Sequence, residues 1–360
     1  MKAMVVTPGK GNSLRVEERP EPRPADGQAL LRTRTIGICG SDREIVAGAA
    51  GAAPDGADSM VLGHECLAEV VSAPSGSGLR PGDLVVPLVR RPCGVSWCVP
   101  CHAGRQDMCW SGEWKERGIH GLDGFGAELF TEDPRYLVPV PNGLQTIGTL
   151  LEPSSIVAKA IDQAWRLQDS REPWEPTRAL VLGAGPIGLL GAAFLRLLGV
   201  DVLVYDRGDG AGPKARWAQG VGARYMVAGG DLAKDLVGER APFEVILECT
   251  GARTLVLSAA LALASGGIMC LLGTSPEDAH ADLPVDRINE HIVLSNGLLL
   301  GSVNAAREHF LKARRFLADA SALWPGCLDH LITERLPVDR VAEAFSGAAP
   351  EIKTVIAFSG

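Results

Sequence analysis

One stretch, from Arg178 to Arg207, constrains the fold more than any other part of the chain. A short apolar run ending at Leu182 is followed by Gly183-Ala184-Gly185-Pro186-Ile187-Gly188, by a helix-length apolar segment to Leu198, and by a β-rich run to Tyr205. Strand, glycine turn, helix and strand in this order are typical of a βαβ unit. The stretch therefore predicts an α/β fold with a doubly wound parallel sheet.

The glycine turn has the spacing G-x-G-x-x-G, which suits the binding of a dinucleotide. Gly183 permits the tight turn, Gly185 lets the backbone approach a pyrophosphate, and Gly188 lets helix and strand pack closely. Pro186 and Ile187 open the helix, where free N–H groups hold phosphate charge. We therefore expect these five residues to bind a cofactor.

Asp206 ends the second strand, 18 residues after Gly188. An acid at about this distance hydrogen-bonds the ribose 2′-OH of a dinucleotide. A carboxylate there would repel a 2′-phosphate, so NAD is favoured over NADP. The neighbouring Arg207 weakens that preference, and NADP stays an alternative.

A membrane span is the other interpretation of this stretch, since residues 179–200 are nearly all apolar. The charge of Arg196, the proline at 186 and the three glycines near one end fit a buried βαβ unit better than a lipid-facing helix. We therefore expect no membrane association.

Length, charge and cysteine content narrow the class of protein. The chain has 360 residues, enough for two domains with separate cores, and its net charge of −8 argues against nucleic-acid binding. Its start lacks the apolar core of a signal peptide, which makes the cytoplasm the expected compartment. There, nine cysteines favour metal binding or catalysis over disulfides.

Residues 1 to about 150 contain short β-like runs separated by Gly/Pro turns, which predicts a β-barrel-like domain. Three motifs in this region contain candidate metal ligands: Cys39-Gly40-Ser41-Asp42, Gly63-His64-Glu65 and Leu151-Glu152-Pro153. Cysteine, histidine and carboxylate together suit zinc. The sequence leaves open whether they converge, since a cysteine or histidine is also common as a buried structural residue.

A second group of candidate ligands consists of Cys93, Cys98, Cys101 and Cys109, all within 17 residues. Four cysteines this close together predict a closed, tetrahedral structural metal site.

Beyond Asp206 the pattern of alternating elements continues. We expect helices over 214–222 and 255–264 and strands over 243–248 and 267–272. Ligands of a doubly wound sheet lie at the carboxyl ends of its strands. The residues that end or follow these two strands are therefore candidate cofactor contacts: Thr250, Gly251, Leu272, Gly273 and Thr274. Short β-like runs from about residue 325 are expected to rejoin the first domain.

The order of these motifs resembles the zinc-dependent medium-chain dehydrogenase family, nearly end to end. Longer tracts are similar to its glucose (aldose) 1-dehydrogenase members; they are residues 38–44 (ICGSDRE), 87–92 (PLVRRP), 104–109 (GRQDMC), 118–125 (GIHGLDGF) and 301–304 (GSVN). The resemblance implies a GroES-like β-barrel catalytic domain, residues 1–170 completed by about 325–360. It implies a Rossmann dinucleotide-binding domain over residues 171–324.

The resemblance also implies roles for the candidate ligands. Cys39, His64 and Glu65 would bind a catalytic zinc, with Glu152 as a fourth or exchangeable ligand near the substrate. Ser41 would bond the substrate oxygen and relay its proton, although a helix N-cap is the alternative role. The four-cysteine group would bind a structural zinc. Its first gap is two residues longer than in the family, which leaves His102 as an alternative ligand to Cys93.

For the substrate, Glu116 falls where the glucose dehydrogenases bind sugar hydroxyls with a carboxylate. Its two acceptor oxygens could serve adjacent hydroxyls, and a solvated loop charge is the alternative. Ser302, Val303 and Asn304 match a segment that meets both nicotinamide and sugar, with Asn304 as the sugar contact. Lys353 resembles a terminal lysine that reaches the cofactor phosphates, with a solvated lysine as the alternative.

Our hypothesis is a zinc-dependent, homo-oligomeric (dimeric or tetrameric) enzyme that oxidises a sugar or polyol carbinol with NAD(P). Val89, Ile156 and Leu294 stand where some relatives have a polar sugar contact. A cyclitol, aminocyclitol or secondary-alcohol dehydrogenase of a biosynthetic pathway is therefore the main alternative. A non-catalytic nucleotide-binding sensor is the alternative from another class, and the complete set of metal ligands argues against it.

Overall fold

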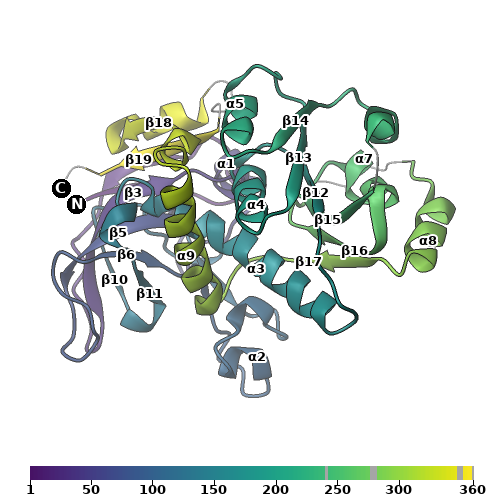
Figure 1. Cartoon of the computed structure of the whole chain (residues 1–360). Helices are drawn as coiled ribbons and strands as arrows, with labels where there is room; N and C mark the ends of the chain where they lie inside the picture. The colour runs from purple at the N-terminus through teal and green to yellow at the C-terminus, as the bar shows by residue number, and fades with distance from the viewer. Residues whose placement is uncertain (240–241, 276–281, 347–351, 359–360) are drawn as a thin grey trace. The chain divides into compact units, whose positions relative to one another are not determined.

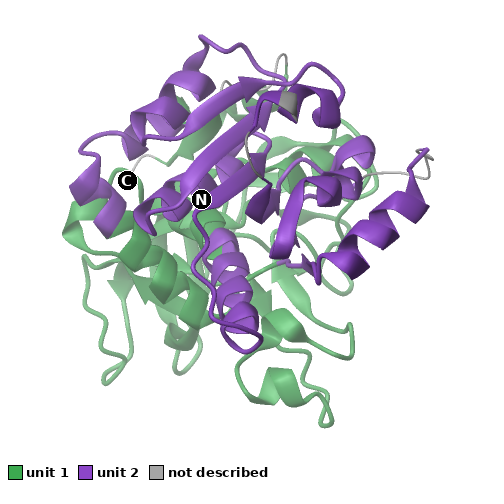
Figure 2. Cartoon of the chain, turned by 45° about the vertical axis from the view of Figure 1, so that its right-hand side comes forward, with its two compact units in different colours: residues 1–155, 304–318, 332–360 green, residues 156–303, 319–331 purple. Residues whose placement is uncertain are grey.

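The computed structural model describes residues 1–239, 242–275, 282–346 and 352–358. The chain forms two compact units, shown in different colours in Figure 2: unit 1 is residues 1–155, 304–318 and 332–360, and unit 2 is residues 156–303 and 319–331. The expected boundaries lay at 170/171 and 324/325. The compact units meet at four boundaries, two of which fall inside long helices: 155/156 in α3 (Leu151–Asp169) and 318/319 in α9 (Arg307–Leu323). The other two lie at 303/304 and 331/332.

Unit 2 is built on a six-stranded sheet in the order β14-β13-β12-β15-β16-β17, with every neighbouring pair parallel (Figure 1). Its strands are β12 (Arg178–Leu182), β13 (Asp201–Asp206), β14 (Arg224–Val227), β15 (Phe243–Glu248), β16 (Leu263–Leu271) and β17 (Leu298–Gly301). This is the strand order of a dinucleotide-binding sheet: successive strands are added on one side of β12, and from β15 onward on the other side. It confirms the predicted doubly wound fold.

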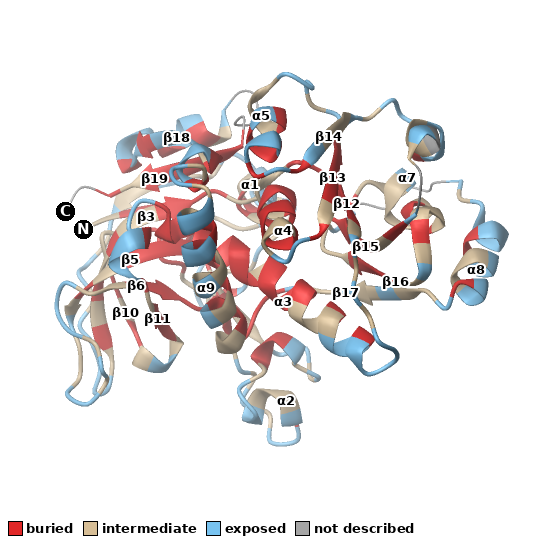
Figure 3. Cartoon of the chain, in the orientation of Figure 1, coloured by how far each residue is buried: buried red, intermediate tan, exposed pale blue. Residues whose placement is uncertain are grey.

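The apolar stretch that follows the glycine turn forms one of the helices of unit 2. These helices are most of α3, then α4 (Pro186–Leu197), α5 (Pro213–Gly220), α6 (Leu232–Asp235), α7 (Arg253–Val256) and α8 (Val285–Leu294). Every residue of α4 from Gly188 to Leu195 is buried, and Figure 3 shows this helix and the central strands as buried. None of the helices in the described part of the chain is long and apolar enough to cross a membrane.

One predicted element of unit 2 is wrong. Residues 255–264 were expected to form one helix, but α7 ends at Val256, a 3₁₀ turn covers Ser258–Ala262, and β16 begins at Leu263. Leu263 is buried and pairs in register with Phe243 of β15. Tertiary pairing with the sheet has overridden the local helical pattern.

Unit 1 is mainly antiparallel, as the β-like runs predicted. Its sheets are β2-β1-β4, a seven-stranded sheet β11-β6-β5-β3-β19-β18 with β10 also on β3, and β7-β8-β9. The strands are β1 (Lys2–Val6), β2 (Arg15–Glu18), β3 (Ala29–Gly37), β4 (Met60–Val61), β5 (Glu65–Ser72), β6 (Leu84–Pro87), β7 (Arg90–Arg91), β8 (Lys115–Arg117), β9 (Gly121–Leu122), β10 (Leu129–Glu132), β11 (Leu137–Pro139), β18 (Ile332–Pro337) and β19 (Lys353–Ala357).

The core of unit 1 joins the two ends of the chain. Leu31, Ile36 and Phe125 from the N-terminal region pack in one buried cluster with Leu336 and Ile356 from the C-terminal strands. The cluster includes residues of β19 and of β3, and these two strands pair antiparallel. The C-terminal segment thereby completes the main sheet of unit 1.

Short helices complete the chain. Unit 1 contains α1 (Gly40–Ala47) and α2 (Val99–His102), and begins both α3 and α9. The 3₁₀ segments are η1 (Gln106–Met108), η2 (Pro134–Tyr136), η3 (Asn142–Leu144), η4 (Gly148–Leu150), η5 (Leu236–Gly238), η6 (Ser258–Ala262), η7 (Leu328–Leu331) and η8 (Val338–Phe345).

The packing of the glycine turn predicts different effects for its second and third glycines. A Cβ at position 188 would lie 1.9 Å from the carbonyl oxygen of Gly183, whereas a Cβ at 185 would meet nothing within 4 Å. We expect Gly188→Ala to lower the free energy of unfolding by about 2 kcal/mol. Gly185→Ala, the matched control, should unfold like the wild type in urea titrations. Equal midpoints for both variants would contradict this account of the turn.

Candidate active site

Cys39, His64 and Glu65 are brought together in unit 1, and the ligand atoms of the three lie within 4.8 Å of one another. Cys39 is the N-cap residue of α1, where its backbone N–H donates to Asp42 Oδ2 at 2.8 Å. His64 and Glu65 are buried where the chain enters β5. One thiol, one imidazole and one carboxylate in this space form a donor set suited to zinc.

Asp42 is a site residue to which the sequence analysis gave no role at the metal. Its buried carboxylate places Oδ1 3.3 Å from His64 Nδ1. A carboxylate in this position holds a histidine in one orientation and directs its other ring nitrogen, Nε2, toward a metal. The signal was present in the C-G-S-D motif, because the cap and the ligand belong to one helical turn.

The groups around His64 favour a positive charge at its imidazole ring. Burial alone would lower the pKa of His64, but the carboxylate of Asp42 and the thiol of Cys39 raise it well above its ordinary value. The same negative groups that favour a proton here would favour a metal cation in its place. The donor atoms and their electrostatics therefore fit a zinc ion held by Cys39, His64 and Glu65.

Glu152 lies in the first turn of α3 and is buried. Among the described residues, the close group of ligand atoms does not include it. Burial raises the pKa of Glu152 to about 8, with opposing contributions from His64 and Glu65 nearby. Its role as a fourth or exchangeable metal ligand stays a prediction.

Lys353 has a different partner from the expected one. Its side chain is buried and its ammonium forms an ion pair with Glu65. Burial alone would lower the pKa of Lys353, but the charges of Glu65 and Cys39 raise it. The solvated alternative for Lys353 is therefore wrong, because its ammonium is buried and paired with Glu65. The expected contact with cofactor phosphates stays a prediction.

Ser41 lies in the first turn of α1, partly exposed, two residues after Cys39. The alternative that Ser41 caps the helix is wrong, because Cys39 is the N-cap residue and Asp42 accepts its backbone N–H. The bond from its hydroxyl to the substrate stays a prediction.

The four-cysteine group includes Cys93, with all four sulfur atoms within 4.8 Å of one another. The Sγ atoms of Cys98 and Cys109 lie 3.8 Å apart, about the edge of a tetrahedron with Zn–S bonds of roughly 2.3 Å. Backbone N–H groups of Cys101, Trp110 and Ser111 outweigh burial and lower the pKa of Cys98 to about 6. The group fits a closed structural metal site, and His102, exposed on α2, lies outside it.

The glycine turn in unit 2 borders a cavity of about 460 Å³. Five predicted cofactor residues line it: Gly183, Gly185, Asp206, Arg207 and Thr250. Gly185 is the N-cap residue of α4, and the space beside its Cα is open. A backbone that can be approached closely at a helix N-terminus suits a pyrophosphate.

Asp206 is fixed against the turn. Its Oδ1 accepts the N–H of Ala184 at 3.0 Å, and its Oδ2 accepts from Gly208 at 2.9 Å and from the hydroxyl of Tyr225 at 3.1 Å. Burial would raise the pKa of Asp206, but the N–H donors of Ala184 and Gly208 lower it. A carboxylate that stays ionised at the edge of the cavity suits a ribose hydroxyl and disfavours a phosphate.

The turns after β15 and β16 pack on each other. A Cβ at Gly251 would lie 2.1 Å from the carbonyl oxygen of Thr274, and a Cβ at Gly273 would lie 2.2 Å from the N of Gly251. Thr250 donates its hydroxyl to Glu248, and the N–H of Leu272 donates to the carbonyl of Glu248. None of Gly251, Leu272, Gly273 and Thr274 lines the cavity at the glycine turn.

The predicted nicotinamide segment follows β17. The N–H of Ser302 donates to the carbonyl of Leu271 at 3.0 Å, and the carbonyl of Val303 accepts from the buried ammonium of Lys159 at 2.9 Å. Lys159 carries no signal in the sequence beyond its place in α3. Neither Ser302 nor Val303 lines the cavity at the glycine turn, nor do Pro186, Ile187 and Gly188.

Glu116 and Asn304 meet in unit 1, although they are 188 residues apart in sequence. Both are buried, and the side-chain amide of Asn304 donates to Glu116 Oε1. The alternative that Glu116 is a solvated loop charge is therefore wrong.

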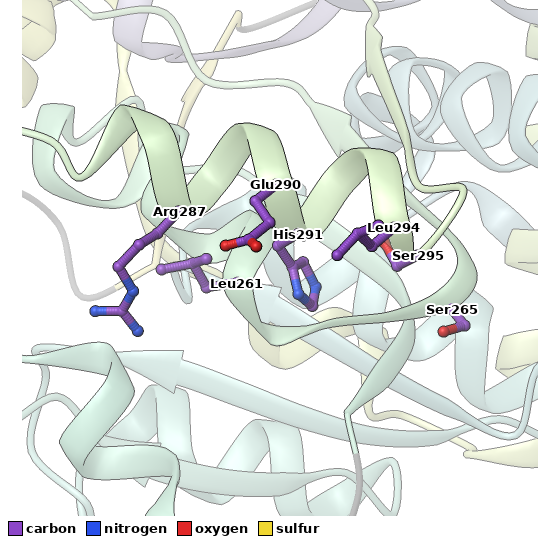
Figure 4. A pocket seen from close by; sticks show the side chains of 7 residues that line it. All are labelled: Leu261, Ser265, Arg287, Glu290, His291, Leu294 and Ser295. Carbon is purple, nitrogen blue, oxygen red and sulfur yellow. The ribbon is translucent and has the colours of Figure 1, made fainter.

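A second cavity in unit 2, of about 420 Å³, lies along α8 (Figure 4). The helix contributes Arg287, Glu290 and His291 to the lining of this cavity. His291 Nε2 lies 2.9 Å from the carbonyl oxygen of Leu263. Leu294, where some relatives were expected to have a polar sugar contact, also lines it. No predicted site residue does.

Two family models match the chain. The alcohol dehydrogenase GroES-like domain matches residues 25–142, and the glucose dehydrogenase C-terminus matches residues 145–358. A glucose 1-dehydrogenase of Methanocella arvoryzae is 39% identical over 357 residues, 99% of both chains. One of Thermoproteus tenax is 40% identical, again over 99% of both chains.

Solved structures agree with these matches. The glucose dehydrogenase of Haloferax mediterranei in complex with NADP, Zn and gluconolactone covers 100% of both chains with a TM-score of 0.91 and 34% identity. A zinc-binding dehydrogenase of Sinorhizobium meliloti bound to NADP covers 99% of this chain and 98% of its own, with a TM-score of 0.82 and 25% identity.

Metal analysis tests the two sets of ligands separately. We expect about two zinc ions per purified chain, and about one in either Cys39→Ser or Cys93→Ser, because each group has lost a ligand. His102→Ala is the matched control for Cys93 and should retain both ions. Loss of zinc in the His102 variant but not in the Cys93 variant would contradict the four-sulfur site. Plasma emission spectroscopy on dialysed protein provides the measurement.

Proposed function

This chain belongs to the glucose 1-dehydrogenase group of the zinc-dependent medium-chain dehydrogenase family, and we propose that it oxidises an aldose at its anomeric carbinol. The carbinol loses a hydride to NAD(P)⁺ and a proton to solvent, giving a lactone and NAD(P)H. The observation that carries the proposal is the convergence of Cys39, His64 and Glu65 from two separate segments.

The metal-binding residues supply the first requirement of this reaction. Zinc held by Cys39, His64 and Glu65 would act as a Lewis acid toward the substrate oxygen. Asp42 holds the imidazole of His64 in the orientation that such a site needs. Ser41, one residue before Asp42 and partly exposed, takes the carbinol proton on its Oγ and passes it outward.

The glycine turn supplies the second requirement. Bound NAD(P) provides the hydride acceptor. Gly183 and Gly185 line the cavity that would receive it, and Asp206 lies at the same cavity, ionised and fixed by backbone N–H groups. The relative from Haloferax mediterranei was solved with NADP. For this chain we propose a preference for NAD, because the Asp206 carboxylate would repel a 2′-phosphate more than Arg207 attracts it.

We also propose the cytoplasm as its compartment. All nine cysteines are free, and seven of them belong to a candidate metal group or are buried. Thiolate metal sites of this kind persist where thiols are kept reduced.

Self-association is the remaining part of the proposal. β17 lies at one edge of the sheet of unit 2, and next to it in sequence Val293, Leu294 and Val303 are 64%, 74% and 60% exposed. An edge strand presents unpaired backbone groups that an identical strand can pair with antiparallel across a two-fold axis. Exposed apolar side chains beside it would be covered by the same contact. We therefore propose a homo-oligomer that contains a β17–β17 dimer.

An activity panel tests the proposed reaction. We expect glucose to be oxidised with a kcat/KM at least about tenfold above those of cyclitols and simple secondary alcohols, and with NAD preferred over NADP. The readout is absorbance at the NAD(P)H band, with the lactone trapped by hydroxylamine. Cys39→Ser, which removes one metal ligand, is the inactive control. A cyclitol that outperforms every aldose would contradict the aldose assignment and leave the dehydrogenase assignment standing.

Light scattering after size exclusion tests the interface. We expect the wild type to elute as a dimer or tetramer, and Leu299→Asp, on the edge strand, to dissociate toward the monomer because it places like charges opposite each other. Leu198→Asp is the matched control, since Leu198 is a similarly exposed leucine at the end of α4. A monomeric wild type, or equal dissociation of both variants, would contradict the proposed interface.

A further inference from the structure

Glu116 sits in a more constrained setting than a sugar-binding carboxylate requires. It lies on β8, and its Cα pairs in register with that of Arg90 on β7. Arg90 Nε donates to Glu116 Oε1 at 2.9 Å, and both side chains are only 7% exposed. A buried carboxylate that accepts a hydrogen bond from a buried guanidinium is held in one orientation.

Asn304 approaches the same oxygen from the other side. Its amide Nδ2 donates to Glu116 Oε1, and its Oδ1 accepts the N–H of Ala305 at 2.8 Å. The residue has a left-handed backbone with φ of 59°, which asparagine tolerates better than most side chains. Both hydrogen bonds to the carboxylate thus end on Oε1, and no described residue donates one to Oε2.

Arg90 is itself held on two sides. Its guanidinium stacks over the ring of Trp114 with 4.0 Å between Cζ and the ring centroid. Its Nη1 donates to the carbonyl of Asp107 at 3.4 Å, two residues before Cys109 of the four-cysteine group. Stacking and directional donation together need the planar guanidinium, which lysine lacks. Arg90 therefore connects the loop that carries the four-cysteine group to the carboxylate of Glu116.

We propose that Arg90 is a positioning residue for substrate recognition. Together with Asn304 it donates to Glu116 Oε1, and this leaves Oε2 to accept one sugar hydroxyl. The inference rests on the proposed function, in which Glu116 binds the sugar. It differs from the expectation that both carboxylate oxygens serve adjacent hydroxyls, because Oε1 has two donors already. It also gives the loop that carries the four-cysteine group a role at the substrate, because this loop supports Arg90.

Arg91 provides a matched control one residue away. Its guanidinium pairs with the buried Glu132 and stacks over Tyr136 at 4.1 Å, which is the same chemistry as that of Arg90. Neither Glu132 nor Tyr136 is a candidate site residue. Loss of Arg91 should therefore cost stability as loss of Arg90 does, without touching the substrate carboxylate.

Steady-state kinetics of the zinc-loaded enzyme test the inference. We expect Arg90→Gln to raise the KM for glucose by about tenfold, with kcat within about threefold and the KM for NAD unchanged, because binding orientation is lost and not the chemistry. Arg90→Lys, less disruptive to the fold, should raise it by a smaller factor. Arg91→Gln should leave all three constants near those of the wild type.

Monodeoxy sugars test the claim of a single oxygen. Glu116→Gln should weaken kcat/KM for glucose by about tenfold, and this penalty should vanish for one monodeoxyglucose only. A penalty that vanishes for two adjacent deoxy positions would overturn the single-oxygen assignment.

Equal rises in KM for Arg90→Gln and Arg91→Gln would overturn the positioning role. A wild-type enzyme that oxidises no sugar would overturn the proposed function, and this inference with it.

Discussion

The candidate metal centre depends on one buried ion pair. Glu65 lies at the start of β5 and is buried next to His64, where an ionised carboxylate without a partner would be costly. Lys353 of β19 provides the cation. The two reach each other across Gly37 of β3, where a Cβ would lie 2.2 Å from Glu65 Oε2. Removal of either partner of such a pair typically costs about 3–5 kcal/mol, because the remaining charge stays buried.

This pair joins the two ends of the chain at the site. The ligands lie within the first 65 residues, and the lysine that neutralises one of them lies in the last strand. The main sheet of unit 1 places β5, β3 and β19 side by side, so the sheet is complete only when β19 has paired with β3. The electrostatics of the metal centre are therefore a property of the finished sheet and not of the motifs alone.

Features that could be predicted from the sequence are those encoded within a few consecutive residues. The βαβ unit follows from a run of strand, glycine turn and helix, and every candidate metal ligand stands in a short motif. The contacts between residues far apart in the sequence were harder to predict. The resemblance pointed to Lys353, Glu116 and Asn304, but not to the pairing of Lys353 with Glu65 or to Arg90. Arg90 and Glu116 meet through strand pairing, and Asn304 joins them from 188 residues further along the chain. Local patterns contain no information about such distances.

The glycines of unit 2 show why residue type alone cannot separate ligand contacts from packing. Gly251 and Gly273 follow strands, as cofactor contacts do, yet each fills a gap so close to the neighbouring turn that a side chain would collide with backbone. Gly185 has the opposite surroundings, since a Cβ there would meet only open space beside the cavity. A glycine packed against backbone is required by the fold whether or not a ligand binds. A glycine bordering open space at a helix N-terminus is explained by a ligand that needs the room.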